Sequence, residues 1–249
     1  MWKLPYDPHP DYVAFKAAVY ARVDPKMAAF FTSGADDTRP RPSIRLDEID
    51  WGGVSVNGIP PLVAPPVIPG SQATWLKDSH VVFGVVVGRA ARAYPRRILA
   101  WHEMALDTLG GERITLVYCT LCGTAIPYKS VVGGVHRTFG TSGLLYRSNK
   151  LMFDDETLSL WSTLEGRPVV GPLTSTGLTL DFHPVVTTTW GEWRRTHPDT
   201  TVLSLTTGFD RSRNMHGKRR PRSSPDRIRS PTTAPSCPDA RAATRPRSS

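Results

Sequence analysis

The sequence predicts an α+β protein with a mainly antiparallel β body, a few short helices and a disordered basic tail. Three observations lead to this prediction. Short apolar runs alternate with turn residues over most of residues 80–205, as is typical of antiparallel strands. Helical patterns occur near the N-terminus and after Pro95. After residue 210, Arg, Pro, Ser, Thr and Ala dominate, and such a composition cannot bury a core.

Residues 1–44 form the predicted N-terminal helical arm. Val13, Ala17 and Tyr20 have helical spacing, and a second helical turn is expected after Pro25. We expect this arm to pack on the body, which is predicted as one α+β domain over residues 45–210.

The body is expected to begin with an extended, proline-rich loop over residues 46–69. Residues 81–87 and 90–94 predict a hairpin of two strands. Pro95 then opens a helix that is expected to run to Leu109, because Ile98, His102, Ala105 and Leu109 share one helical stripe. Gly110 and Gly111 predict its left-handed stop, and residues 114–118 the next strand.

Short β segments separated by turns are expected downstream, followed by a last helix over residues 191–196. The predicted segments are 125–132, 135–139, 144–153, 158–164, 178–180, 185–190 and 202–205.

The charge is unevenly placed. Residues 211–249 carry eleven Lys or Arg and two Asp, so the formal excess of +9 lies in this tail and residues 1–210 are electroneutral. A basic cluster attracts polyanions, so nonspecific nucleic-acid binding through Arg219, Arg220 and Arg222 is one functional hypothesis. It requires that the tail is genuine.

No signal peptide and no run of about 18 apolar residues is visible, so no membrane span is predicted. As written, the sequence predicts a cytoplasmic protein, or an exported one if the start is misassigned. Three cysteines, two of them close together, do not resemble the disulfide framework of a small secreted domain.

Cys119 and Cys122 form a Cys-x-x-Cys motif with three readings: a redox pair, half of a metal site, or two packed thiols. A four-cysteine zinc site is disfavoured, because the remaining cysteine, Cys237, lies in the tail. Two thiolates completed by His102 or another His would suit copper or zinc. However, a helix to Leu109 and a returning strand would separate His102 from Cys119 by about 12 Å along the elements.

A second hypothesis is a ligand-binding or hydrolase-like enzyme with structural cysteines. Glu103, beside Trp101 in a partly apolar setting, and Asp154 are candidate acids or bases, and Ser142 lies in a predicted loop of small residues that could hold an anion. The alternatives are a core histidine at His102, an ordinary turn residue at Asp154 and a serine without assigned catalytic partners at Ser142.

Seven stretches of the body resemble a bacterial and archaeal family, domain-of-unknown-function family 3179 (DUF 3179). They are Ala93-Tyr94-Pro95, Trp101-His102-Glu103, Tyr118-Cys119-Thr120-Leu121-Cys122-Gly123, Phe139-Gly140-Thr141-Ser142-Gly143-Leu144-Leu145, Leu151-Met152-Phe153-Asp154, Ser159-Leu160-Trp161-Ser162, and Thr189-Trp190-Gly191-Glu192-Trp193 with His197-Pro198. The resemblance implies no particular reaction, since the family has none established. It fades after Gly208-Phe209-Asp210, where family members continue with Tyr-rich strands. A frameshifted reading of GC-rich DNA would produce such a tail; translation of the other two frames tests that idea.

The first functional hypothesis is therefore a metal-binding or thiol-redox domain that uses Cys119 and Cys122, with His102 and Glu103 lining the same cleft and Asp154 nearby. Its cofactor would be copper or zinc, and its partner a small ligand or a metal.

Overall fold

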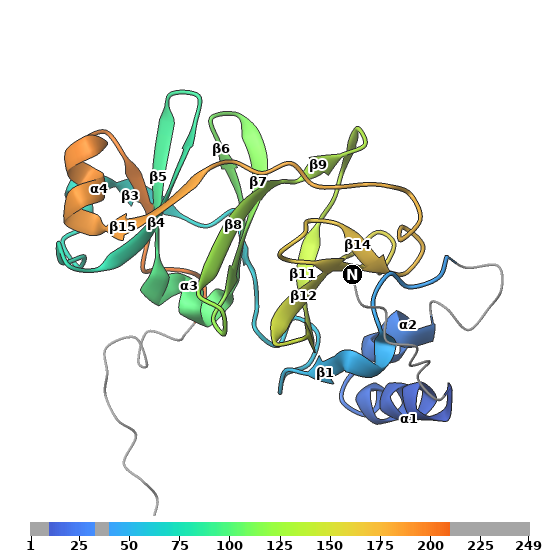
Figure 1. Ribbon diagram of the computed structural model, residues 1–249. Helices are drawn as coiled ribbons and strands as arrows, with labels where there is room; N and C mark the ends of the chain where they lie inside the picture. The colour runs from blue at the N-terminus through green and yellow to red at the C-terminus, as the bar shows by residue number, and fades with distance from the viewer. Residues whose placement is uncertain (1–9, 33–39, 210–249) are drawn as a thin grey trace, which may run out of the picture.

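The computed structural model describes residues 10–32 and 40–209 (Figure 1). This part of the chain forms three β-sheets of four or five strands and one two-stranded sheet, with helices at the two ends. Nearly all strand pairs are antiparallel; β2 with β6 and β5 with β16 are parallel. The predicted α+β class, dominated by antiparallel strands, is confirmed. The tail from residue 211, with Arg219, Arg220, Arg222 and Cys237, lies outside the described residues.

The β12 sheet and the helical arm form one end of the molecule (Figure 1). The sheet contains, in order, β1 (Ile49–Trp51), β11 (Phe139–Tyr146), β12 (Asn149–Asp154), β13 (Leu160–Ser162) and β14 (Pro168–Val170). Helices α1 (Pro10–Ala21) and α2 (Pro25–Thr32) cover it, as the sequence predicts. Phe30 packs its ring 5.5 Å from that of Phe153 and is fully buried with Met27.

The β4 sheet forms the other end (Figure 1). Its order is β15 (Val185–Thr189), β4 (Val81–Val87), β5 (Ala90–Pro95), β16 (Thr201–Leu203) and β3 (Val67–Pro69). Helix α4 (Trp190–Thr196) buries Trp190 and Trp193 against it, and Thr189 caps the helix by accepting a hydrogen bond from the N–H of Glu192. The β4–β5 hairpin agrees with the prediction.

The β7 sheet lies between the other two and consists of β2 (Leu62–Val63), β6 (Met104–Leu109), β7 (Glu112–Cys119) and β8 (Thr124–Lys129). One apolar core joins it to the β4 sheet through Phe83 and Tyr118, whose rings lie 5.0 Å apart. A second core joins it to the β12 sheet. In this core Met104 and Val117 of the β7 sheet lie with Phe139 and Trp161 of the β12 sheet, and the ring of Phe139 packs edge-on against that of Trp161. In the sequence, a small hairpin of β9 (Val131–Val132) and β10 (Val135–His136) connects β8 of the β7 sheet to β11 of the β12 sheet.

The predicted helix to Leu109 is wrong at its C-terminal end. Helix α3 (Arg96–His102) opens after Pro95 as expected, but the chain leaves it at Glu103 and continues as strand β6. Every residue of β6 pairs with β7, and Leu109 pairs with Glu112 around a two-residue turn. Gly110 and Gly111 have φ of 59° and 84°, so they form this hairpin turn rather than a helix stop.

Four smaller expectations also need correction. Residues 139–143 begin strand β11 instead of forming a loop. Residues 144–153 contain a hairpin turn at Arg147-Ser148, with φ of 48° and 63°, rather than one continuous strand. Residues 46–69, expected as an extended loop, contain a short 3-10 helix (Leu46–Glu48) and strands β1, β2 and β3. Residues 178–180, expected as a strand, do not form one.

In the described part of the chain, no helix combines the length and apolar character that a membrane crossing requires.

Candidate functional site

A cavity of about 240 Å³ lies where the β7 sheet meets the β12 sheet. Its walls come from the loop over residues 52–59, the end of α3, the β7–β8 turn, and strands β11 and β12. Apolar side chains form much of the wall. The polar or ionisable residues of the lining are Glu103, Cys119, Thr120, Thr141 and Lys150.

Glu103 ends α3 in a left-handed backbone conformation, with φ of 56°. Its N–H donates to the carbonyl of Leu99, and its own carbonyl accepts from the N–H of Tyr118 at 2.8 Å. This conformation is uncommon for a residue other than glycine and persists only where surrounding contacts hold it. Its side chain lies in the cavity wall, where Oε1 accepts a hydrogen bond from the Thr120 hydroxyl at 2.9 Å.

Lys150 supplies a buried cation behind these residues, with 7% of its side chain exposed. Its Nζ donates to the backbone carbonyls of Glu103 at 2.8 Å and Tyr118 at 3.3 Å, and lies 3.5 Å from Oε2 of Glu103. Burial lowers the pKa of Lys150 to about 8, although the charges of Glu103, Cys119 and Cys122 act to raise it. The ammonium thus holds the end of α3 and the end of β7 together.

Cys119 lies at the start of the β7–β8 turn and Cys122 lies within it. Cys119 is the last residue of β7, and the N–H of Gly123 donates to its carbonyl at 2.8 Å. The Nδ2 atom of Asn149 lies 3.2 Å from the sulfur of Cys122 and 3.8 Å from that of Cys119, so one amide contacts both thiols. Both cysteines are free thiols.

The two thiols have opposite environments. Cys119 is buried and Cys122 is exposed. Burial raises the pKa of Cys119, and its hydrogen bond to Cys122 adds to this effect. Burial also acts to raise the pKa of Cys122, but hydrogen bonds from Cys119, Thr124 and Asn149 outweigh it and lower the pKa of Cys122. Cys122 is therefore the better nucleophile, since the thiolate is the reactive form.

Asp154 is fully buried at the far end of β12 from Lys150, about 13 Å along the strand, and does not line the cavity. Its carboxylate accepts hydrogen bonds from the indole of Trp161 at 2.8 Å and from Thr157, and pairs with Arg137 at 3.5 Å. These contacts fix the turn after β12 and tie it to β13 and to the segment before β11, so the geometry favours a structural role.

Ser142 is also fully buried and lies outside the cavity lining. Its hydroxyl donates to the carbonyl of Leu151 at 2.7 Å and accepts from the N–H of Leu144 at 3.1 Å. These bonds stabilise the irregular pairing of β11 with β12 between Thr141 and Leu145. No His or Asp partner contacts the hydroxyl among the described residues.

His102 is buried on α3, and its Nδ1 lies 2.9 Å from the carbonyl of Pro60. Its ring lies 5.3 Å from that of Phe209. Within residues 10–32 and 40–209, no three His, Cys, Asp or Glu side chains gather closely enough to hold a metal ion. The cavity thus brings together Glu103 and Cys119 of the predicted site residues, with Cys122 beside them.

Comparison with known protein families finds a match that spans Glu103, Cys119, Cys122 and Lys150 of this site. The family described as "Protein of unknown function (DUF3179)" matches residues 56–233. The chain belongs to this family. The match begins later than the predicted domain over residues 45–210 and extends past its end into the basic tail. No curated protein and no solved structure matches the chain.

Sequence reasoning did not identify Lys150, Asn149 and Thr120 as site residues. A usable signal existed for Lys150: it directly precedes the apolar run Leu151-Met152-Phe153, and a lysine in a buried strand requires partners. Asn149 and Thr120 carry no such signal, because their roles depend on contacts between strands that are distant in sequence.

Proposed function

We propose that this protein carries out thiol–disulfide exchange through Cys119 and Cys122. The observation that supports this reading is the contrast between an exposed thiol of lowered pKa and a buried thiol of raised pKa, beside the buried cation of Lys150. An exposed thiolate next to a protected second thiol is the arrangement that two-step exchange requires.

In the first step, the Cys122 thiolate attacks one sulfur of a substrate disulfide. A mixed disulfide forms, the substrate S–S bond breaks, and the other substrate sulfur leaves as a thiolate. In the second step, Cys119 loses its proton and attacks the sulfur of Cys122. The intramolecular disulfide forms, the second substrate thiolate leaves, and the protein has given two electrons to the substrate.

The position of each cysteine in the β7–β8 hairpin decides which thiol attacks first and which one resolves the mixed disulfide. In this hairpin the second cysteine of the motif attacks and the first one resolves, because Cys119 lies on strand β7 and Cys122 lies in the exposed turn. Lys150 contributes positive charge near both sulfurs, and its backbone N–H hydrogen-bonds to Cys119, which favours the Cys119 thiolate needed in the second step.

Trapping experiments test these roles. In a Cys237→Ser background, Cys119→Ser should accumulate a mixed disulfide with 5-thio-2-nitrobenzoate after reaction with its dimer, because no resolving thiol remains. Cys122→Ser should react at least tenfold more slowly. Mass spectrometry of the intact protein reads out both products. Equal labelling of the two variants, or no intramolecular disulfide in the background protein across glutathione buffers, would disprove the proposal.

Copper or zinc binding by the two thiolates stays a prediction, which metal analysis of the purified protein tests. Bound metal at one equivalent that is lost in Cys119→Ser would favour metal binding over exchange. The hydrolase reading has less geometric support, because Ser142 and Asp154 do not line the cavity that holds Glu103.

A further inference from the structure

The cavity of about 240 Å³ beside Cys119 has a largely apolar wall. Its apolar side chains come from the loop over residues 52–59, from the β7–β8 turn and from β11, and they are Val54, Ile59, Leu121, Leu144 and Leu145. Gly52 and Gly143 add backbone atoms to the same wall, and the N–H of Gly52 donates to the carbonyl of Gly143 at 2.8 Å.

The polar side chains of the lining already have partners within the protein. The hydroxyl of Thr120 donates to Glu103, and that of Thr141 donates to the carbonyl of Ile59 at 2.8 Å. Glu103 and Lys150 carry opposite charges 3.5 Å apart, and Lys150 also donates to two backbone carbonyls. A charged ligand would lose its water here while the charges of the lining are matched to each other. The lining therefore favours an apolar occupant.

The cavity is large enough for a bulky side chain and lies next to the attacking sulfur. An apolar cavity of about 150 Å³ holds benzene, so this one can hold a side chain as large as phenylalanine. Cys119 lines the cavity and its thiol hydrogen-bonds to that of Cys122. Consecutive Cα atoms of a peptide are about 3.8 Å apart, so the residue next to a substrate cysteine can enter the cavity while the cysteine meets Cys122.

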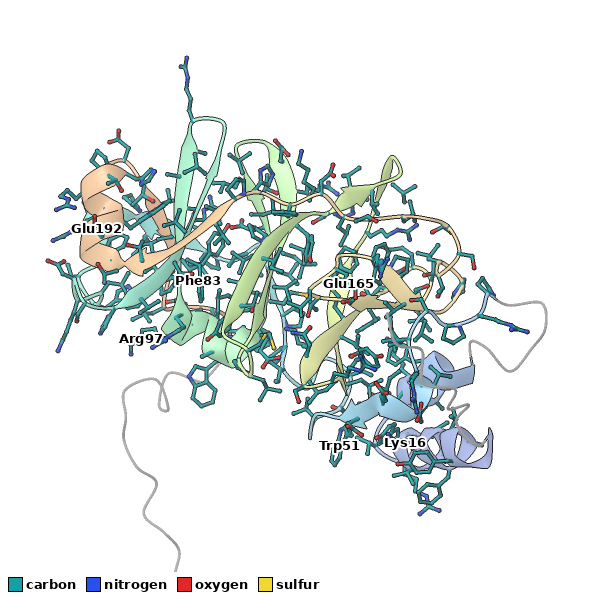
Figure 2. All side chains as sticks on the ribbon, viewed as in Figure 1. Lys16, Trp51, Phe83, Arg97, Glu165 and Glu192 are labelled. Carbon is teal, nitrogen blue, oxygen red and sulfur yellow. The ribbon has the colours of Figure 1, made fainter. Side chains whose placement is uncertain are left out.

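Two large apolar side chains are exposed beside the cavity. Leu121, in the β7–β8 turn, is 65% exposed, and Trp51 is 44% exposed. The indole N–H of Trp51 donates to the carbonyl of Val54 at 2.7 Å, which holds Trp51 against the loop that forms one wall. Figure 2 shows Trp51 at the lower rim of the molecule, below strands β11 and β12. Exposed apolar surface that continues from a cavity is typical of a contact with a peptide or protein chain.

On the basis of the thiol–disulfide exchange proposed above, we propose that its substrate is a peptide or protein disulfide with a large apolar side chain next to the reacting cysteine. This side chain occupies the cavity while Cys122 attacks the substrate sulfur, and the bonds that form and break are those of the two exchange steps. Small charged disulfides such as glutathione disulfide are poor substrates, because their carboxylates and ammonium groups gain no partner among the lining residues.

The test compares two peptide disulfides that differ in one side chain, the homodimers of acetyl-Phe-Cys-amide and acetyl-Gly-Cys-amide. The full chain with Cys237→Ser is reduced and mixed with each, and mass spectrometry follows formation of the intramolecular disulfide. Each rate constant is divided by that of dithiothreitol with the same peptide, which removes differences in intrinsic reactivity. We expect the Phe peptide to react at least about tenfold faster, because burial of its phenyl group stabilises the complex.

A pair of valine variants shows whether the cavity causes this preference. Val54→Glu places a carboxylate in the apolar wall and should reduce the preference to less than about threefold, because the phenyl group then displaces water from a charge. Val63→Glu is the matched control and should keep the preference, since Val63 is 69% exposed and does not line the cavity. Melting temperatures check that both variants fold.

The outcomes separate the substrate class from the exchange itself. Equal rates for the two peptides, glutathione disulfide as fast as the Phe peptide, an unchanged preference in Val54→Glu or an equal loss in Val63→Glu would overturn the substrate class and leave the exchange standing. Failure of every disulfide to oxidise the reduced protein would overturn both.

Discussion

Lys150 shows how a single buried charge couples the candidate site to stability. Its ammonium has three acceptors, two of them backbone carbonyls that would otherwise be partly unsatisfied at the ends of α3 and β7. Burial of a charge remains costly even with such partners. The consequence is a dependence of stability on pH.

We expect the free energy of unfolding to rise between about pH 8 and pH 9.5. The pKa of Lys150 is about 8 in the folded protein and about 10.4 in the unfolded chain, so the unfolded state binds more protons in this window. A complete transition through both pKa values would correspond to about 3 kcal/mol. Urea denaturation at several pH values measures the effect.

The matched comparison is Lys150→Met, which keeps a side chain of similar length and removes the titrating group. Its unfolding free energy should rise less with pH than that of the wild type over the same range, because only the other titrating groups remain. Parallel pH profiles for the two proteins would contradict the assigned pKa of Lys150.

The two cysteines should differ sharply in their rate of alkylation. At pH 7.5 we expect iodoacetamide to modify Cys122 at least about tenfold faster than Cys119, because Cys122 is exposed with a lowered pKa and Cys119 is buried with a raised one. Peptide mapping by mass spectrometry at short reaction times gives both rates. Similar rates would remove the distinction on which the proposed order of attack depends.

Among single residues, the sequence indicated some of the site residues and not others. The Cys-x-x-Cys spacing and the carboxylate of Glu103 stand out in the sequence, and both line or border the cavity. The sequence also marked Asp154 and Ser142, since an acid at a turn and a serine among glycines resemble reactive groups. Their hydrogen bonds to Trp161 and Leu151 come from neighbouring strands, and no local pattern reveals such partners.

Among the elements, strand β6 shows why periodicity failed after His102. The apolar residues Ala105 and Leu109 fit a helical stripe, but every residue of β6 is paired in register with β7. That pairing satisfies the backbone and buries both residues, so tertiary contact outweighs the local helical preference. The Gly110-Gly111 pair between two apolar runs was the stronger local signal, because both residues take the positive φ of a two-residue hairpin turn.

The contact between α4 and the β4 sheet depends on the absence of a side chain at Gly84. A Cβ atom there would lie 2.1 Å from the ring of Trp193, which is fully buried. We expect Gly84→Ala to destabilise the protein by about 1–3 kcal/mol, because the indole must move out of a packed core. Urea denaturation measures the loss, and tryptophan fluorescence reports displacement of the ring.

Val86→Ala provides a control on the same strand, since Val86 is 41% exposed. Its cost should stay below about 1 kcal/mol, the range of strand propensity. If Gly84→Ala is no more destabilising than this control, α4 can shift without loss and the close packing is not needed.

For the whole molecule, the sequence predicts the class but not the arrangement. Strand runs and turns identify most strands, because they are local features. The division into three larger sheets and a two-stranded one depends on pairings between distant segments, such as β1 with β11 and β16 with β5, and on the parallel pairing of β2 with β6. Nothing in the local pattern specifies those partners.

A buried ionic network joins the β4 sheet to the β7 sheet and supplies the last prediction. Asp107 on β6 accepts hydrogen bonds from the guanidinium of Arg92 at 2.5 Å and from the hydroxyl of Tyr94 at 2.7 Å, both on β5. The side chains of Arg92 and Asp107 are only 12% and 6% exposed. Asp107→Ala would leave the Arg92 cation without its carboxylate and the Tyr94 hydroxyl without its acceptor, and we expect a loss of about 3–5 kcal/mol in urea denaturation.

The triple variant Arg92→Leu, Tyr94→Phe and Asp107→Leu separates the cost of unpaired groups from the net value of the network. Replacement of a whole buried ionic group by apolar residues is often neutral or stabilising, so this variant should recover most of the stability that Asp107→Ala loses. A triple variant as unstable as Asp107→Ala would mean that the network itself holds the two sheets together. Recovery would mean that the apolar core around Phe83 and Tyr118 does so, and that the polar groups chiefly fix how the sheets are aligned.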